Sequence, residues 1–328
     1  MKVIGMFLVA CVLGGCPVAP QAVVIETVPV GNPGNAGELS GSGAGAYGPD
    51  RICGAVDYVF NISKYEVTAG QYTEFLNAVA ATDTYGLYSM NMDTAVHAWG
   101  CNIKRSGTSG NYTYTVGDGS ATDVADWGNR PVNYVSWGDA ARFANWLHNG
   151  QATGAQGPNT TEDGSYYLNG ATSDAALLAV VRKPGATWVI SSEDEWYKAA
   201  YHKNDGVTGD YWDYPTRTNA VPDNGNPGGD TGNSANYYDG DWTIGSPYWR
   251  TNVGFFGQSS SPYGTFDQGG NVWEWNEAIL YGSSRGMRGG AFGRDDFPTY
   301  ALLASYRDYY GIPTDEYNNV GFRVSEVP

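Results

Sequence analysis

The residues best suited to chemistry in this chain form a glycine-rich turn followed by a carboxylate, at Gly269-Gly270-Asn271-Val272-Trp273-Glu274. Paired glycines let the backbone turn so that carbonyl oxygens converge, and Glu274 adds a carboxylate two residues after Val272. Oxygen donors of this kind are the ligands that calcium prefers. The turn is therefore a candidate calcium cage. The alternative is that Asn271 and Glu274 only cap a turn.

Other catalytic chemistries have little support in the sequence. The three histidines, His97, His148 and His202, form no HxxxH or HxH pair of the kind that builds a metal centre. The chain has no phosphate-binding loop and no set of kinase motifs. Adjacent acids such as Asp295-Asp296 are interpreted as solvated loop charges, because neighbours in sequence need not face each other.

The first cysteines bear on export. Cys16 ends the run Leu13-Gly14-Gly15-Cys16, which resembles a bacterial lipobox, and the apolar stretch before it has the length of a secretory signal core. Leu8-Val9-Ala10-Cys11 also fits a lipobox, and cleavage near Ala22 would instead release a soluble protein. We therefore expect an exported protein, periplasmic or at the cell surface, that meets a membrane only through an N-terminal lipid on Cys16.

Cys53 and Cys101 remain after such processing, and both lie in loop-like sequence. In an oxidising compartment this arrangement predicts one disulfide. The alternative, a redox or metal pair, has no CxxC spacing to support it.

The composition indicates a fold with little regular secondary structure. The 328 residues include 46 Gly, 25 Tyr and 11 Trp, and only 16% are charged. Glycine permits unusual backbone angles, and tyrosine and tryptophan bury large areas, so aromatic packing can fix long loops. The net charge of −16 argues against nucleic acid as a partner, because phosphate backbones would repel the chain.

Three short amphipathic helices are predicted at capped residues. The first follows Thr68, the second begins at Ser136, and the third begins at Ser191 or Ser192. Short β-prone runs lie between and after these helices, at 58–62, 112–116, 187–190 and 320–324.

The chain is predicted to hold one domain. Residues 1–16 form the signal or lipobox segment, and residues 17–49 are a Gly/Pro-rich tether with one edge strand near Val23 to Val28. Residues 50–328 form the domain itself. Inside it, the acidic and glycine-rich stretch 204–240 is expected to be a long loop pinned by ions, aromatic side chains or function.

Six short motifs follow one another along this domain, namely Ile62 to Thr68, Arg130 to Trp137, Ser191 to Lys198, Gly269 to Trp275, Arg288 to Phe292 and Asn319 to Arg323. Together they resemble the formylglycine-generating-enzyme, or sulfatase-modifying factor, family over nearly the whole mature chain. The resemblance implies an α+β fold, that family's variant of the C-type lectin-like fold, with few short helices and strands.

The resemblance also implies two structural calcium sites. The matching residues are Asp267, Gly270, Val272 and Glu274 for the first site, and Asn236, Tyr237 and Asp241 for the second. In the first site the glycine and the valine would act through their backbone carbonyl oxygens.

The catalytic cysteines of the family have no counterpart here. Its enzymes oxidise a substrate cysteine to formylglycine with molecular oxygen, using two cysteines that bind copper(I). The corresponding interval, 293–319, contains no cysteine: Ala304 matches one position and Pro298 or Thr299 the other. Hydroxyl and methyl groups cannot replace thiolates as ligands of a soft metal. We therefore expect no bound copper, and the oxidase is kept as the alternative function.

An aromatic surface in place of the cysteines predicts an extracytoplasmic, calcium-stabilised binding or scaffolding protein that holds a glycan, a peptide or a protein. The candidate face comprises Trp249, Arg294, Tyr300, Tyr306, Arg307, Tyr309 and Tyr310. A second alternative is a hypervariable surface ligand receptor, because 293–319 is rich in the Tyr, Asn and Asp that adenine-directed diversification produces. So many tyrosines would also be consistent with self-assembly.

Overall fold

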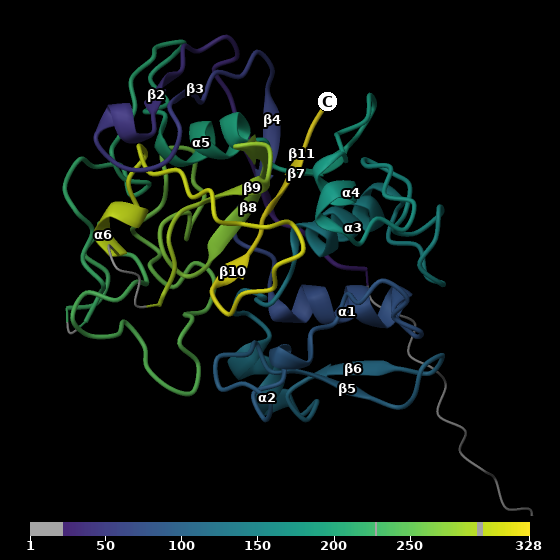
Figure 1. Ribbon diagram of the computed structural model, residues 1–328. Helices are drawn as coiled ribbons and strands as arrows, with labels where there is room; N and C mark the ends of the chain where they lie inside the picture. Colours follow the sequence, from purple (N-terminus) through teal and green to yellow (C-terminus); the bar gives the residue numbers. More distant parts are fainter. Residues whose placement is uncertain (1–21, 227, 294–297) are drawn as a thin grey trace, which may run out of the picture.

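Figure 1 shows a computed structural model that describes residues 22–328 except 227 and 294–297. The helices are α1 (Ala69–Val79), α2 (Ala121–Trp127), α3 (Trp137–His148), α4 (Asp174–Leu178), α5 (Glu193–Tyr201) and α6 (Pro298–Ala301), with short 3-10 turns at Ser42–Ala44 and Met90–Met92. The strands are β1 (Thr27–Val30), β2 (Glu38–Ser40), β3 (Arg51–Cys53), β4 (Phe60–Ser63), β5 (Ile103–Ser106), β6 (Thr113–Val116), β7 (Trp188–Ile190), β8 (Trp273–Leu280), β9 (Ser284–Arg288), β10 (Val320–Gly321) and β11 (Val324–Glu326). These short elements confirm the predicted mixed α+β class.

Two sheets organise the elements. One has the strand order β1-β4-β11-β7, and its neighbouring strands are all antiparallel. The other has the order β10-β8-β9, with β10 parallel and β9 antiparallel to β8. Because β10 and β11 are nearly consecutive in sequence, the C-terminal segment joins the two sheets. Two strand pairs, β2-β3 and β5-β6, lie outside them.

The three predicted helix starts are confirmed. The side chain of the N-cap residue accepts a hydrogen bond from the backbone N–H of the residue three positions later. The side chain of that later residue accepts a hydrogen bond from the backbone N–H of the N-cap residue. The capping pairs are Thr68 with Gln71, Ser136 with Asp139, and Ser192 with Glu195. The caps place α1 and α3 against one core, where Phe75 and Phe143 meet edge to face with ring centroids 5.3 Å apart.

The described part of the predicted tether is folded onto the domain. β1 pairs with β4 at the edge of the four-stranded sheet, and β2 pairs with β3. Tyr47 stacks on Tyr306 and Tyr309 from the other end of the chain. Glycine and proline content cannot distinguish a free tether from a segment whose turns pack against distant residues, so the folded domain begins earlier than residue 50. Cys16 lies outside the described residues.

The predicted disulfide is absent, because Cys53 and Cys101 are both free and buried. Cys53 packs among aromatic side chains of α5, whereas Cys101 lies in the main core with α1 and α3. The prediction was wrong because loop-like sequence around a cysteine does not reveal which hydrophobic cluster the thiol enters.

The long loop at 204–240 has neither helix nor strand among its described residues, as predicted. Its aspartates hold turns. The carboxylate of Asp223 accepts hydrogen bonds from the backbone of Gly225 and from the hydroxyls of Thr231 and Ser234. Over the described ranges, no helix combines the length and the apolar character needed to cross a bilayer.

Candidate functional site

Ala304, which stands where the resemblance expects a catalytic cysteine, lies in a closed aromatic cluster. It is 5% exposed and packs with Cys53 and with α5 side chains that include Trp196 and Tyr201. Its carbonyl oxygen accepts a hydrogen bond from Arg288. The position is therefore filled by a methyl group inside the core rather than presented at an open site.

A thiol does reach this cluster, from an unexpected part of the chain. Arg288 Nη2 lies 3.5 Å from the Sγ of Cys53 and donates to it. Burial raises the pKa of Cys53 to about 11 even though the Arg288 charge opposes the shift. The thiol is therefore protonated at neutral pH, and the cluster holds no other cysteine among the described residues. A two-thiolate copper site is not reproduced here.

One buried carboxylate ties the surrounding segments together. Glu193, the first residue of α5, is bound by Arg307 at 2.7 and 2.8 Å, by Arg288 at 2.9 Å and by Arg51 at 2.8 Å. Burial alone would raise the pKa of Glu193, but the three positive charges lower it to about 2. The charge also stands at a helix N-terminus, where the helix dipole favours an anion. Arg307, predicted to face a ligand, is instead 3% exposed.

Tyrosines near Arg307 meet tyrosines from two distant parts of the chain at the surface. We define the tyrosine cluster as Tyr47, Tyr281, Tyr306, Tyr309 and Tyr310. Tyr47 stacks on Tyr306 and Tyr309 at centroid distances of 5.2 and 5.0 Å, and its hydroxyl lies 2.8 Å from those of Tyr309 and Tyr310. Tyr281 meets Tyr309 edge to face at 5.0 Å. Tyr281 and Tyr310 are 67% and 62% exposed, so the cluster reaches the surface of the protein.

The cluster stands on a rigid base. Tyr306 packs against Trp273 of β8, with ring centroids 5.7 Å apart, and Trp273 is 5% exposed. The next residue, Arg307, is fixed on Glu193. Sequence reasoning found Tyr306, Tyr309 and Tyr310 but missed Tyr47 and Tyr281. Tyr47 lies in the segment that was predicted to be a tether, and Tyr281 follows β8, a strand that was not predicted.

The other residues of the predicted face lie elsewhere. Trp249 belongs to a group of indoles with Trp99 and Trp242, at centroid distances of 5.9 and 4.9 Å. Tyr300 is 52% exposed on α6. Arg294 lies outside the described residues. Tyr306, Tyr309 and Tyr310 therefore lie together on one surface, whereas Trp249 packs with other tryptophans.

At the predicted first calcium site, the main carboxylate is already paired. Arg323 donates to the two oxygens of Glu274 at 2.5 and 2.7 Å, and Trp196 Nε1 donates to one of them at 2.6 Å. Asp267 accepts a hydrogen bond from the backbone of Gly254 at 2.5 Å, and burial raises the pKa of Asp267 to about 6. An arginine-paired carboxylate does not fit the role of a free calcium ligand, so Glu274 as paired here does not support the calcium cage that the resemblance implies at Asp267, Gly270, Val272 and Glu274.

The residues predicted for the second site are only partly brought together. The carbonyl oxygen of Asn236 accepts from Asn271 at 2.8 Å, which places Asn236 against the first turn. Tyr237 instead donates its hydroxyl to the Pro222 carbonyl. The carbonyl of Asp241 accepts from Asn224 within the long loop. Within the described part of the chain, no group of three or more acids, histidines or cysteines is placed to hold a metal ion.

The comparisons with known proteins agree with this architecture. The sulfatase-modifying factor enzyme 1-like domain matches residues 54–326. Because this match spans most of the sequence, the chain belongs to that family, and the resemblance seen in the six motifs is confirmed. No curated protein matches the chain.

Three solved structures share the fold. The structure of CarF has 19% identity and a TM-score of 0.53, and the match covers 94% of this chain and 100% of CarF. Treponema denticola variable protein 1 has 16% identity and a TM-score of 0.53, with 95% and 98% covered. PvdO from Pseudomonas aeruginosa has 18% identity and a TM-score of 0.51, with 92% and 94% covered. At these identities the likeness concerns the fold alone.

The arginine network around Glu193 predicts a large effect of Glu193→Gln. Losing the charge would leave Arg288 and Arg307 buried without a counter-ion, which should lower the free energy of unfolding by about 3–5 kcal/mol at pH 7. The folded pKa of about 2 lies below the ordinary value of 4.5, so the charge stabilises fully above pH 4.5 and its contribution is lost as the pH falls toward 2. Urea unfolding as a function of pH should therefore show the gap between wild type and variant closing over that window.

Glu26→Gln is the matched control, because Glu26 is 60% exposed and pairs with Lys64 at the surface. It should change stability by at most about 1 kcal/mol. A Glu193→Gln variant as stable as this control would contradict the role given to the network.

Removal of calcium with a chelator tests whether Arg323 or a calcium ion neutralises the carboxylate of Glu274. If Arg323 is its counter-charge, metal analysis of the purified protein should find no calcium at this turn, and EGTA should leave Tm unchanged. Arg323→Gln, by contrast, should lower Tm sharply, because it strands a buried carboxylate. Stoichiometric calcium together with a fall in Tm on chelation would contradict this pairing and support the predicted cage.

Proposed function

We propose that this protein is a non-catalytic member of its family that holds a glycan, a peptide or a protein through the tyrosine cluster, outside the cytoplasm. The observation that supports this most strongly is the position of the cluster. Three of its five tyrosines stand on the segment 304–310, in which, by the resemblance, the family's enzymes carry a catalytic cysteine and this chain carries a buried alanine. The exchange of a cysteine for an alanine beside three tyrosines supports a role in recognition rather than in oxidation.

The physical character of the cluster suits this role. Tyrosine offers a large apolar ring with a hydroxyl that donates and accepts, and few rotatable bonds are lost when it binds. Tyr47 restrains Tyr309 and Tyr310 from one side, through the hydroxyl contacts at 2.8 Å. Trp273 and the Glu193 network fix the base. A surface ordered before binding gains affinity because little conformational entropy remains to be lost.

We also propose lipid attachment at Cys16, self-assembly, and a role as a hypervariable surface ligand receptor, all of which agree with a binding function. Each would place or diversify the tyrosine cluster without changing its chemistry. Diversity in 293–319 would reach a ligand at exposed positions such as Tyr300, Tyr310 and Tyr317, which are 52%, 62% and 42% exposed.

The double variant Tyr309→Ser/Tyr310→Ser tests the proposal. Ligands for the wild-type protein are first selected from a glycan array and a displayed peptide library. Removing two central aromatic side chains should then weaken binding of the selected ligands by about 2 kcal/mol or more, roughly 30-fold. Dissociation constants can be measured by biolayer interferometry, with Tm recorded to show that the variant is folded.

Tyr167→Ser is the control, since Tyr167 is 59% exposed and lies outside the tyrosine cluster. It should bind the selected ligands like the wild type. Equal affinity of the double variant and the control would overturn the proposed face.

A further inference from the structure

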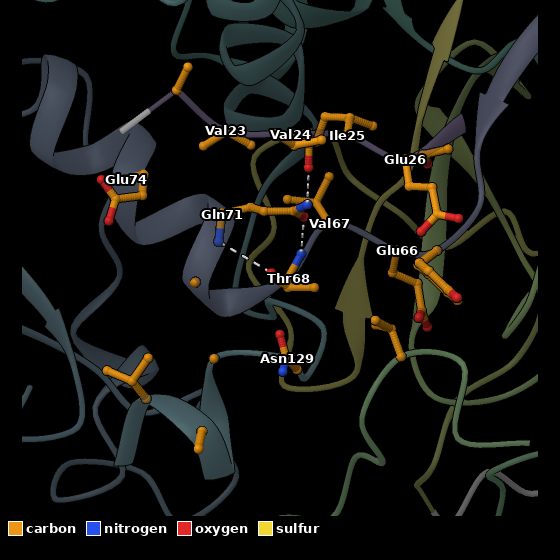
Figure 2. Close-up of a pocket in the computed structure, with 18 of the residues that line it drawn as sticks. Val23, Val24, Ile25, Glu26, Glu66, Val67, Thr68, Gln71, Glu74 and Asn129 are labelled. Carbon is orange, nitrogen blue, oxygen red and sulfur yellow. Dashed lines mark hydrogen bonds between the residues drawn. The ribbon is translucent and has the colours of Figure 1, made fainter. Parts of the chain in front are cut away.

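Two regions outside the tyrosine cluster bring apolar and polar side chains together at the surface. The first is a groove between the N-terminal segment, the start of α1 and α2, and its wall is largely aliphatic (Figure 2). Glu26 in this wall is paired with Lys64 at 2.7 Å, and Glu66 is only 2% exposed. The groove therefore offers a ligand little beyond apolar contact. The second region has unused polar groups as well.

This second region is a row of aromatic rings, which we define as the aromatic row: Tyr238, Trp242, Trp249 and Trp99, named in the order in which they touch. Neighbouring ring centroids are 4.8, 4.9 and 5.9 Å apart, and the ring planes meet at 64°, 70° and 59°. Rings that meet at such steep angles leave part of their faces uncovered. All four residues are partly exposed, so the row is an aromatic patch at the surface.

The row joins two distant segments of the chain, and one buried arginine holds them together. Arg250 is 0% exposed and donates to the carbonyl oxygens of Trp99 and Gly100, both at 2.8 Å. The preceding residue, Trp249, donates its indole N–H to the carbonyl oxygen of Ala98 at 3.2 Å. The rings are therefore positioned before any ligand arrives, which reduces the entropy lost on binding.

Trp249 has a backbone conformation that is unusual for a bulky residue. Its φ is 60°, in the left-handed region that favours glycine. Its carbonyl oxygen accepts a hydrogen bond from the side chain of Asn236 at 3.1 Å, which helps to hold this conformation. Strained residues of this kind concentrate at ligand sites, so the position of the Trp249 ring points to a role beyond packing.

Unused polar groups indicate which ligand would complete the row. Within the part of the chain that the structure describes, the indole N–H groups of Trp99 and Trp242 have no acceptor, and neither nitrogen is buried. Asp239 and Asp241 are exposed, and they flank the row in sequence between Tyr238 and Trp242. The row therefore combines ring faces with both hydrogen-bond donors and acceptors.

We propose that the aromatic row binds a neutral oligosaccharide, at a site that shares no residue with the tyrosine cluster. A sugar ring has an apolar C–H face that stacks on an aromatic ring, and its hydroxyls both donate and accept. These hydroxyls satisfy the indole N–H groups as well as the carboxylate of Asp239. An organic cation would stack on the rings but leave the N–H donors without acceptors. An acidic glycan would be repelled by the aspartates and by the net charge of −16.

Trp242→Ala tests the site. The probes are hexasaccharides of glucose, N-acetylglucosamine, galactose, mannose and xylose, each titrated at millimolar concentration by isothermal titration calorimetry. The wild type should bind at least one of them. Trp242→Ala should weaken that binding about tenfold or more, because it removes a ring face and an N–H donor together. Tm is recorded for each variant.

Trp212→Ala is the matched control, because Trp212 is also partly exposed but lies against Lys203 outside the row. It should leave the affinity within about twofold of the wild type. Asp239→Ala gives a second test that removes no ring, at an exposed residue where the fold is at little risk. It should weaken the hexasaccharide about threefold or more through the lost acceptor.

Further arms separate the alternatives. The Tyr309→Ser/Tyr310→Ser variant should keep the hexasaccharide; loss of binding in that variant, with Trp242→Ala unaffected, would assign the glycan to the tyrosine cluster and overturn this proposal. The proposal is also overturned if the wild type binds none of the five hexasaccharides, if hexagalacturonate binds as well as they do, or if choline displaces them. It fails too if a folded Trp242→Ala, or Asp239→Ala, behaves like Trp212→Ala, or if Trp242→Ala weakens the library-selected peptides instead.

Discussion

The arrangement of the residues around Ala304 and of the tyrosine cluster depends on one constraint, the buried charge of Glu193. It gathers three arginines from β3, from β9 and from the segment before the last strands, and so joins parts of the chain that are far apart in sequence. An ion pair this deep is stable only while every partner is present. The same network pulls Arg307 inward and seats Ala304 beside Cys53, so that the neighbouring tyrosines project outward as one surface.

Much of the fold could be predicted, because its signals are local. A capping residue and its answering side chain are three positions apart, so the starts of α1, α3 and α5 were evident at Thr68, Ser136 and Ser192. The ordered motifs gave the family, which the domain match confirms. Of the residues predicted for the ligand face, Tyr306, Tyr309 and Tyr310 lie together in the structure, since they are within five residues of one another.

The misses all concern partners that are distant in sequence. Strand β8 escaped notice because Glu274 interrupts its apolar pattern, and only its pairing with Arg323 makes that carboxylate acceptable in the core. The proposed disulfide failed because Cys53 and Cys101 enter different clusters. Tyr47 was hidden in a segment whose composition suggests a tether. In each case the deciding contact is tertiary, and neither spacing nor composition records it.

The central claim is that this family member holds a ligand and does not oxidise a cysteine. The most direct measurement is mass spectrometry of a cysteine-containing sulfatase peptide after incubation with the purified protein, copper(I) and oxygen. Our account predicts that the cysteine is recovered unchanged, because Ala304 replaces a thiolate and the Cys53 thiol is buried and protonated. Conversion of that cysteine to an aldehyde, at a rate that depends on the protein, would contradict the account.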